Sequence, residues 1–115
     1  PRGFFMLEKK MIAGEPFVIR FKIRRNKLPA DITGIPVKIQ LRNKSPEGPV
    51  ISEWGDGSPE ITRDDLAGLV TFSLSSSYTN TQTFKEAFTD LLLMHDPLGL
   101  RSALIKVTLH RGVTR

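Results

Sequence analysis

Cysteine is absent from this chain of 115 residues, and histidine occurs only twice. Without cysteine the chain has no disulfide framework, no thiolate metal ligand and no cysteine nucleophile. The nine glycines fall in turns and form no phosphate-binding fingerprint. Long apolar runs are also lacking, since the longest, residues 91–94, is far shorter than a membrane-crossing helix. We therefore expect no disulfide scaffold and no membrane association.

The polar residues offer little for catalysis. His95 precedes an Asp-Pro turn and His110 lies on the polar side of an alternating segment, so both are interpreted as structural. Four acidic residues lie close in sequence but lack the alternating ligand spacing of a calcium loop: Asp56, Glu60, Asp64 and Asp65. We therefore expect no enzymatic activity, no metal site and no cofactor.

Length and charge set the broad class. A chain of this size predicts one domain over residues 1–115 with a single core. The net charge of +5 permits an acidic partner but is also ordinary for a soluble domain. Residues 1–7 lack the apolar core and the cleavage site of a signal peptide. We expect Pro1 to follow removal of a methionine, and synthesis in the cytoplasm of the host cell.

Apolar residues alternate with polar ones along most of the chain. This period of two is typical of strands that bury one face and expose the other. It predicts strands over residues 17–24, 37–42, 70–74 and 105–110. Residues 49–54 and 88–95 are two further expected strands, the second covered on both faces. Turn clusters between them favour a β-sandwich or barrel.

Two segments outside this alternation receive separate predictions. Thr62 as an N-cap, Asp65 three residues later and Gly68 at the end predict a short helical turn near residues 62–67. Residues 1–14 are expected to form an N-terminal arm or an edge strand.

Basic residues gather on two of the expected strands. Arg20, Lys22 and Arg24 alternate on the first, and Lys38 and Arg42 on the second. They would share one outward face if the two strands belonged to one sheet, and such a face could follow a nucleic-acid backbone. Single-strand binders also expose aromatic residues for base stacking, whereas the phenylalanines here fall on the apolar sides. Nucleic-acid binding is therefore the less favoured alternative.

Five segments in this order carry a family resemblance. They are residues 24–34 (RRNKLPADITG), 35–42 (IPVKIQLR), 61–72 (ITRDDLAGLVTF), 90–99 (DLLLMHDPLG) and 107–115 (VTLHRGVTR). Together they resemble the immunoglobulin-like domain at the N-terminus of tailed-phage baseplate upper proteins, over roughly residues 15–115. The resemblance implies an all-β fold, an immunoglobulin-like antiparallel β-sandwich. The family pattern differs at Lys27, where such a hairpin usually has glycine.

The resemblance also implies a function. It predicts a non-enzymatic virion structural protein, an adaptor of the tail or baseplate, located in the virion. Its partners would be other phage structural proteins, in a symmetric homo-oligomer. Capsid decoration by the same fold, an adhesion module outside phage and a basic nucleic-acid-binding β-domain remain alternatives.

The expected interaction surface combines the apolar start of the chain, the basic strands and the C-terminal end. We hypothesise that the first residues and residues 112–115 reach neighbouring subunits. The candidate residues are Phe4, Phe5, Leu7, Arg20, Lys22, Arg24, Lys38, Arg42 and Arg115.

Overall fold

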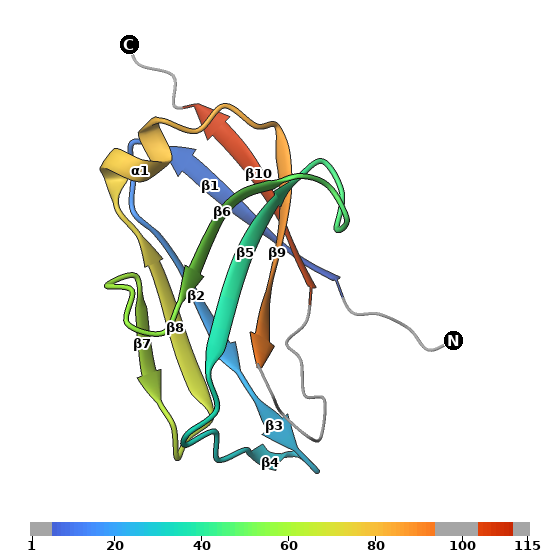
Figure 1. Cartoon of the computed structure of the whole chain (residues 1–115). Helices are drawn as coiled ribbons and strands as arrows, with labels where there is room; N and C mark the ends of the chain where they lie inside the picture. The colour runs from blue at the N-terminus through green and yellow to red at the C-terminus, as the bar shows by residue number, and fades with distance from the viewer. Residues whose placement is uncertain (1–5, 94–103, 112–115) are drawn as a thin grey trace.

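The computed structural model describes residues 6–93 and 104–111 and shows a β-sandwich with one short helix (Figure 1). The four strands expected from the alternation and the two further expected strands are present, and residues 6–13 form the edge strand that was one of the two alternatives for residues 1–14. Strands β3, β4 and β7 and the helix α1 were not expected. The elements in chain order are β1 (Met6–Ala13), β2 (Phe17–Lys22), β3 (Arg24–Arg25), β4 (Leu28–Pro29), β5 (Val37–Asn43), β6 (Val50–Gly55), β7 (Ile61–Asp64), β8 (Leu69–Leu74), α1 (Ser76–Asn80), β9 (Glu86–Leu93) and β10 (Leu104–Arg111).

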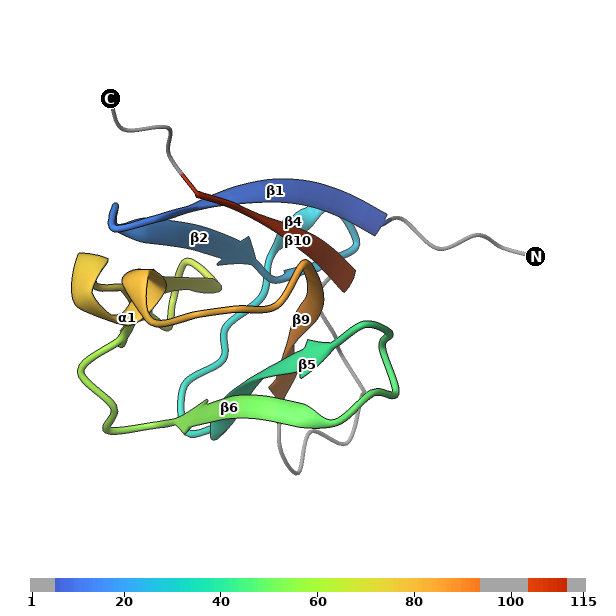
Figure 2. The ribbon, with the colours of Figure 1, turned by 90° about the horizontal axis from the view of Figure 1, so that it is seen from above.

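The strands form two sheets that face each other (Figure 2). A five-stranded sheet has the order β1-β10-β9-β5-β6, and a three-stranded sheet has the order β2-β8-β7. A two-stranded hairpin, β3-β4, continues from the end of β2. The all-β sandwich prediction is therefore confirmed. The sheets are not wholly antiparallel, because β1 pairs with β10 in parallel, from Met6 opposite Leu104 to Ala13 opposite Arg111.

Alternate residues of the strands fill the layer between the sheets. The inward residues of β2 and β5 are almost completely buried, and Phe72 and Ile39 are among the largest side chains at its centre. Burial of a side chain of this size contributes about 1.5–3 kcal/mol. β9 lies centrally in its sheet, and its consecutive residues Ala87, Phe88 and Thr89 are all buried. That confirms the expectation of a strand covered on both faces.

Trp54 closes the core beside the helix. Its ring meets those of Phe72 and Tyr78 edge-on, with centroids 4.7 and 5.7 Å apart. Ser52 and Tyr78 join their hydroxyl groups at 2.5 Å across the same corner. The helix α1 begins at the N-cap Ser75, whose side chain accepts a hydrogen bond from the Tyr78 amide. The serine-rich segment after β8 is thus ordered by the helix cap and by the contact of Tyr78 with Trp54.

The helical turn expected near residues 62–67 is wrong. Residues 61–64 instead form β7, paired with β8 from Ile61 opposite Phe72 to Asp64 opposite Leu69. A four-residue turn then leads into β8, closed by a hydrogen bond from the Gly68 amide to the Asp65 carbonyl. The capping pattern was overruled because pairing with β8 satisfies the same backbone groups and buries more apolar surface.

Gly68 lies where two segments of backbone meet. Its φ of +64° is left-handed, and a Cβ there would lie 2.5 Å from the carbonyl oxygens of Ile23 and Ala30. Its own carbonyl accepts a hydrogen bond from the Ile23 amide at 2.7 Å. The β7-β8 turn can therefore contact the β3-β4 hairpin only if this position is glycine.

Gly68→Ala is expected to lower the free energy of unfolding by more than about 2 kcal/mol, because conformational strain and a backbone clash add together. Gly34→Ala is the matched control, since Gly34 has a φ of +79° with open space around it. It should cost only the left-handed strain of about 1 kcal/mol. Urea unfolding measures both, and equal losses would contradict the clash.

Arg63 ties the two sheets together at their rim. Its guanidinium contacts Asp56 at 2.8 Å and Asp65 at 2.7 Å, and donates to the Ile32 carbonyl at 2.8 Å. The second oxygen of Asp56 accepts a hydrogen bond from the Val37 amide, the first residue of β5. The side chain of Arg63 is 19% exposed, so these contacts are partly shielded from water. The arginine therefore fixes β7 against the start of β5.

Arg63→Met keeps the apolar stem and removes three charged contacts. We expect it to lower the free energy of unfolding by about 1–2 kcal/mol. The loss should shrink at high salt, because partly exposed ion pairs are screened. Lys38→Met, which breaks the more exposed pair with Glu53, is the control and should change stability much less. A loss for Arg63→Met no larger than for Lys38→Met would show that the tie is not stabilising.

Candidate interaction surface

The basic residues predicted to share one face lie in different sheets. Arg20 and Lys22 are in β2 of the three-stranded sheet, whereas Lys38 and Arg42 are in β5 of the five-stranded sheet. The condition for one shared cationic face, that both strands lie in one sheet, is therefore not met. Alternation shows which side of its own strand a residue occupies, but long-range pairing decides which sheet the strand joins.

The cations of β5 are matched within their own sheet. Lys38 contacts Glu53 of β6 at 2.8 Å, and this hydrogen bond holds the pKa of the Glu53 carboxyl below its ordinary value. Arg42 donates to the Gly48 carbonyl at 2.8 Å and to the Gln40 side chain at 2.9 Å. This part of the predicted surface is occupied by intramolecular contacts.

The cations of β2 are not matched. Arg20 and Lys22 are exposed, as is Arg24 of the adjoining β3. Among the described residues none of these three side chains forms an ion pair or a hydrogen bond. Their charges are therefore available to a partner.

The first half of β1 extends the same region. Leu7 is 53% exposed, and the next three residues, Glu8, Lys9 and Lys10, are exposed as well. Met11, on the same side of the strand as Leu7 and Lys9, is completely buried. The strand thus leaves the core toward its N-terminal end. Phe4, Phe5 and Arg115, also predicted for the surface, lie outside the described residues.

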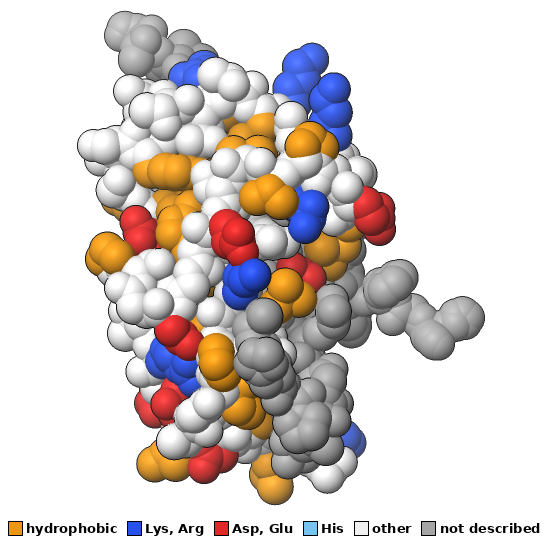
Figure 3. All heavy atoms as spheres, viewed as in Figure 1, with side chains coloured by type: hydrophobic (Ala, Val, Ile, Leu, Met, Phe, Trp, Pro, Cys, Tyr) orange, Lys and Arg blue, Asp and Glu red, His pale blue; other side chains and the backbone are white. Residues whose placement is uncertain are grey.

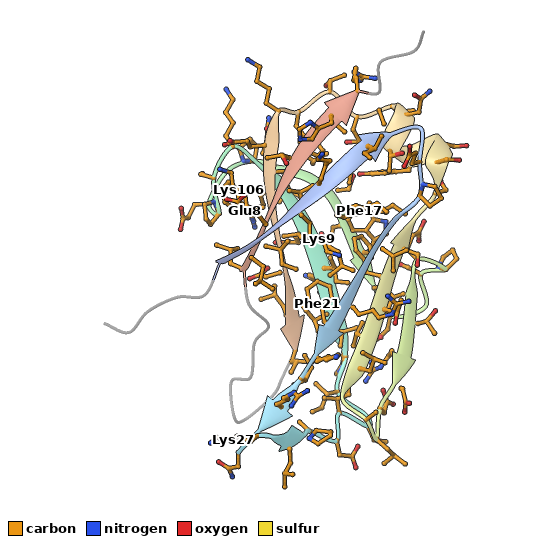
Figure 4. The ribbon with its side chains drawn as sticks, turned by 180° about the vertical axis from the view of Figure 1, so that it is seen from behind. Glu8, Lys9, Phe17, Phe21, Lys27 and Lys106 are labelled. Carbon is orange, nitrogen blue, oxygen red and sulfur yellow. The ribbon has the colours of Figure 1, made fainter. Side chains whose placement is uncertain are left out.

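Strands β1 and β2 diverge from the connection that joins them (Figure 4). They belong to different sheets, and a single hydrogen bond between the described parts of the two strands is seen, from Lys9 Nζ to the Val18 carbonyl at 3.4 Å. At the joined end, Thr79 accepts from the Gly14 amide and donates to the Glu15 carbonyl, which fixes the connection. The exposed residues of the two strands are Leu7, Glu8, Lys9, Lys10, Arg20 and Lys22. Lys9 and Lys10 were missed because their relation to β2 is not a sequence pattern.

Two hollows lie at opposite ends of the sandwich. One of about 510 Å³ is lined by Asn43, Lys44 and residues 83–86. The other, about 230 Å³, lies between the β3-β4 hairpin and the β7-β8 turn. Its lining residues are Lys22, Ile23, Arg24, Pro29, Ala67 and Leu69. The smaller hollow thus adjoins the unmatched cations of β2 and β3.

Polar side chains of the described residues meet at two places that resemble parts of a catalytic site. Asp56 and Asp65 do converge, but on Arg63, and residues 6–93 and 104–111 contain no group of three potential metal ligands. The Ser52 hydroxyl meets Tyr78, whose pKa is raised above its ordinary value by burial. This hydroxyl pair lies beside Trp54 at the corner of the core. No described helix has the length and hydrophobicity to cross a membrane.

No protein-family model matches the chain, and no curated protein matches it in sequence. The structure is nevertheless similar to a solved structure, the N-terminal domain of phage TP901-1 ORF48. The two share 14% sequence identity, with a TM-score of 0.61. The similarity covers 93% of this chain and 96% of that chain, so the fold of this chain is that of a domain found in a phage protein.

Proposed function

We propose that this chain is a non-enzymatic structural component of a bacteriophage particle, an adaptor that joins other proteins of the tail or baseplate. The observation that carries the proposal is the fold similarity, which extends over nearly the whole of both chains. Neither chain therefore adds a large insertion in which a separate activity would reside. In this proposal the sandwich is of the immunoglobulin-like type and the chain resides in the virion.

The surface supports a role in protein assembly. Leu28 and Leu66 are 66% and 75% exposed, on the β3-β4 hairpin and the β7-β8 turn. These two segments meet through Gly68, so both leucines lie at one end of the sandwich, where Figure 3 shows exposed hydrophobic side chains. Exposed apolar residues beside unmatched cations are typical of surfaces that contact other proteins.

The nucleic-acid alternative loses its main support. It required the cations of β2 and β5 on one face, and these strands lie in different sheets. It also required exposed aromatic rings, whereas Phe17, Phe21 and Phe72 are buried. Assembly with other phage proteins, in symmetric copies, is therefore the interpretation that we carry forward.

Mass spectrometry of particles purified from the phage or prophage that encodes this chain tests the proposal. The chain should remain at a fixed ratio to the other particle proteins through a density gradient. Antibody against it should label the tail or its tip in electron micrographs. Particles that lack the chain would contradict a structural role, and label on the head would reassign it to capsid decoration.

A basic protein can adhere to particles without being part of them. Nuclease treatment and a wash at high salt are therefore the controls, because charge-driven adsorption weakens steeply with ionic strength. A chain that is built into the particle should resist both treatments.

A further inference from the structure

We infer that the free edge of β2 docks an extended acidic segment of a neighbouring protein, which adds to the three-stranded sheet as a further strand. The inference rests on the proposed function and names the chemistry of one partner. The register and the hydrogen bonds of β2 fix the directions of its backbone groups.

The odd-numbered residues of β2 direct their backbone hydrogen bonds toward β8. The register runs from Phe17 opposite Leu74 to Lys22 opposite Leu69, and the Ile23 amide donates to the Gly68 carbonyl in continuation. The Ser73 amide, opposite Val18, instead donates away from β2 to the Glu60 carbonyl. In an antiparallel ladder, residues that do not pair with one neighbour direct both backbone groups toward the other side. Val18, Arg20 and Lys22 therefore present theirs to the free edge.

No described strand occupies that edge. β2 is the outermost strand of its sheet, and β1 belongs to the other sheet. Lys9 Nζ reaches the Val18 carbonyl, and no bond from another described residue reaches the outward backbone groups of Arg20 or Lys22. The backbones of β1 and β2 diverge and are farther apart at the Phe21 end of β2 than at Phe17 (Figure 4). A row of unpaired amides and carbonyls is a template for another strand.

The other sheet edges are less suitable. β7, on the opposite side of the same sheet, is four residues long. β6 carries Glu53, which is already matched by Lys38, and its pairing with β5 contains a register shift. β2 offers six residues, a continuous register and no proline. The remaining edge, β1, has eight residues and no proline, but it pairs in parallel with β10 and carries Glu8 beside its lysines, whereas the exposed side chains of β2 are all cationic.

Charge determines the kind of partner. Arg20, Lys22 and Arg24 are exposed and form no ion pair among the described residues, and Lys9 of β1 reaches the Val18 carbonyl from the other sheet. A second copy pairing through β2 would bring like charges together, which is unfavourable. A segment with acidic residues at every second position would instead place a carboxylate opposite each cation of β2.

Fluorescence anisotropy with a synthetic peptide tests the inference on the full chain. The probe has about nine residues, the length of an ordinary strand, and alternates glutamate with valine and threonine. Arg20→Glu combined with Lys22→Glu should weaken its binding about tenfold or more, because two attractive pairs become repulsive. Lys44→Glu combined with Lys85→Glu makes the same charge change at the other end of the sandwich and should leave binding unchanged. Thermal unfolding verifies that both variants are folded.

A second probe separates strand pairing from simple charge attraction. The same peptide with N-methyl groups on alternate amides keeps its carboxylates but cannot form the ladder. It should bind at least about tenfold more weakly. The amides of Arg20 and Lys22 should exchange more slowly with solvent when the unmodified peptide is bound.

Three results would overturn the inference. They are equal binding of the N-methylated peptide, equal binding by both double variants, and tighter binding of an oligothymidylate with the same number of charges. Concentration-dependent dimerisation through β2 would assign the edge to a second copy instead. If the variant with Arg20→Glu and Lys22→Glu no longer binds the peptide but is still incorporated into particles, the β2 edge is not needed for assembly. That result would contradict the inference and leave the proposed structural role intact.

Discussion

The buried layer between the two sheets is the constraint on which the rest of this small protein depends. Its inward side chains, centred on Phe72 and Ile39, are almost fully excluded from water. A domain of about this size has one such core and a modest margin of stability. Each strand must therefore direct its apolar side toward this layer. Every connection must lead the chain to the correct sheet without exposing the layer to water.

Residues at the rim of the sandwich hold the strands and connections in place around this layer. Gly68 permits the β7-β8 turn to meet the backbone at Ile23 and Ala30. Arg63 holds β7 against the start of β5 through Asp56. Thr79, completely buried, fixes the connection between β1 and β2.

Closing the core in this way leaves the edge of β2 open. β1 belongs to the other sheet, where it pairs with β10, and it diverges from β2, so it does not pair with that edge. A protein with this arrangement must protect the exposed edge, and charge is one way to do so. The cations Arg20 and Lys22 would discourage pairing with a second copy and favour an acidic segment. The same residues thereby provide solubility and, in our proposal, selectivity for a partner in the particle.

Sequence alone determined four strands and the inward side of each, because alternation is a local property set by the geometry of the strand. The left-handed turn at Asn26 and Lys27, with φ of 53° and 67°, explains why glycine is usual at the second position. The sequence could not determine that β2 and β5 lie in different sheets, or that residues 61–64 pair instead of forming a helical turn. Those outcomes depend on contacts between distant segments, which minimise exposed apolar surface over the whole chain. Only the tertiary structure therefore decided which cations are matched, as Lys38 is, and which remain open to a partner, as Arg20 does.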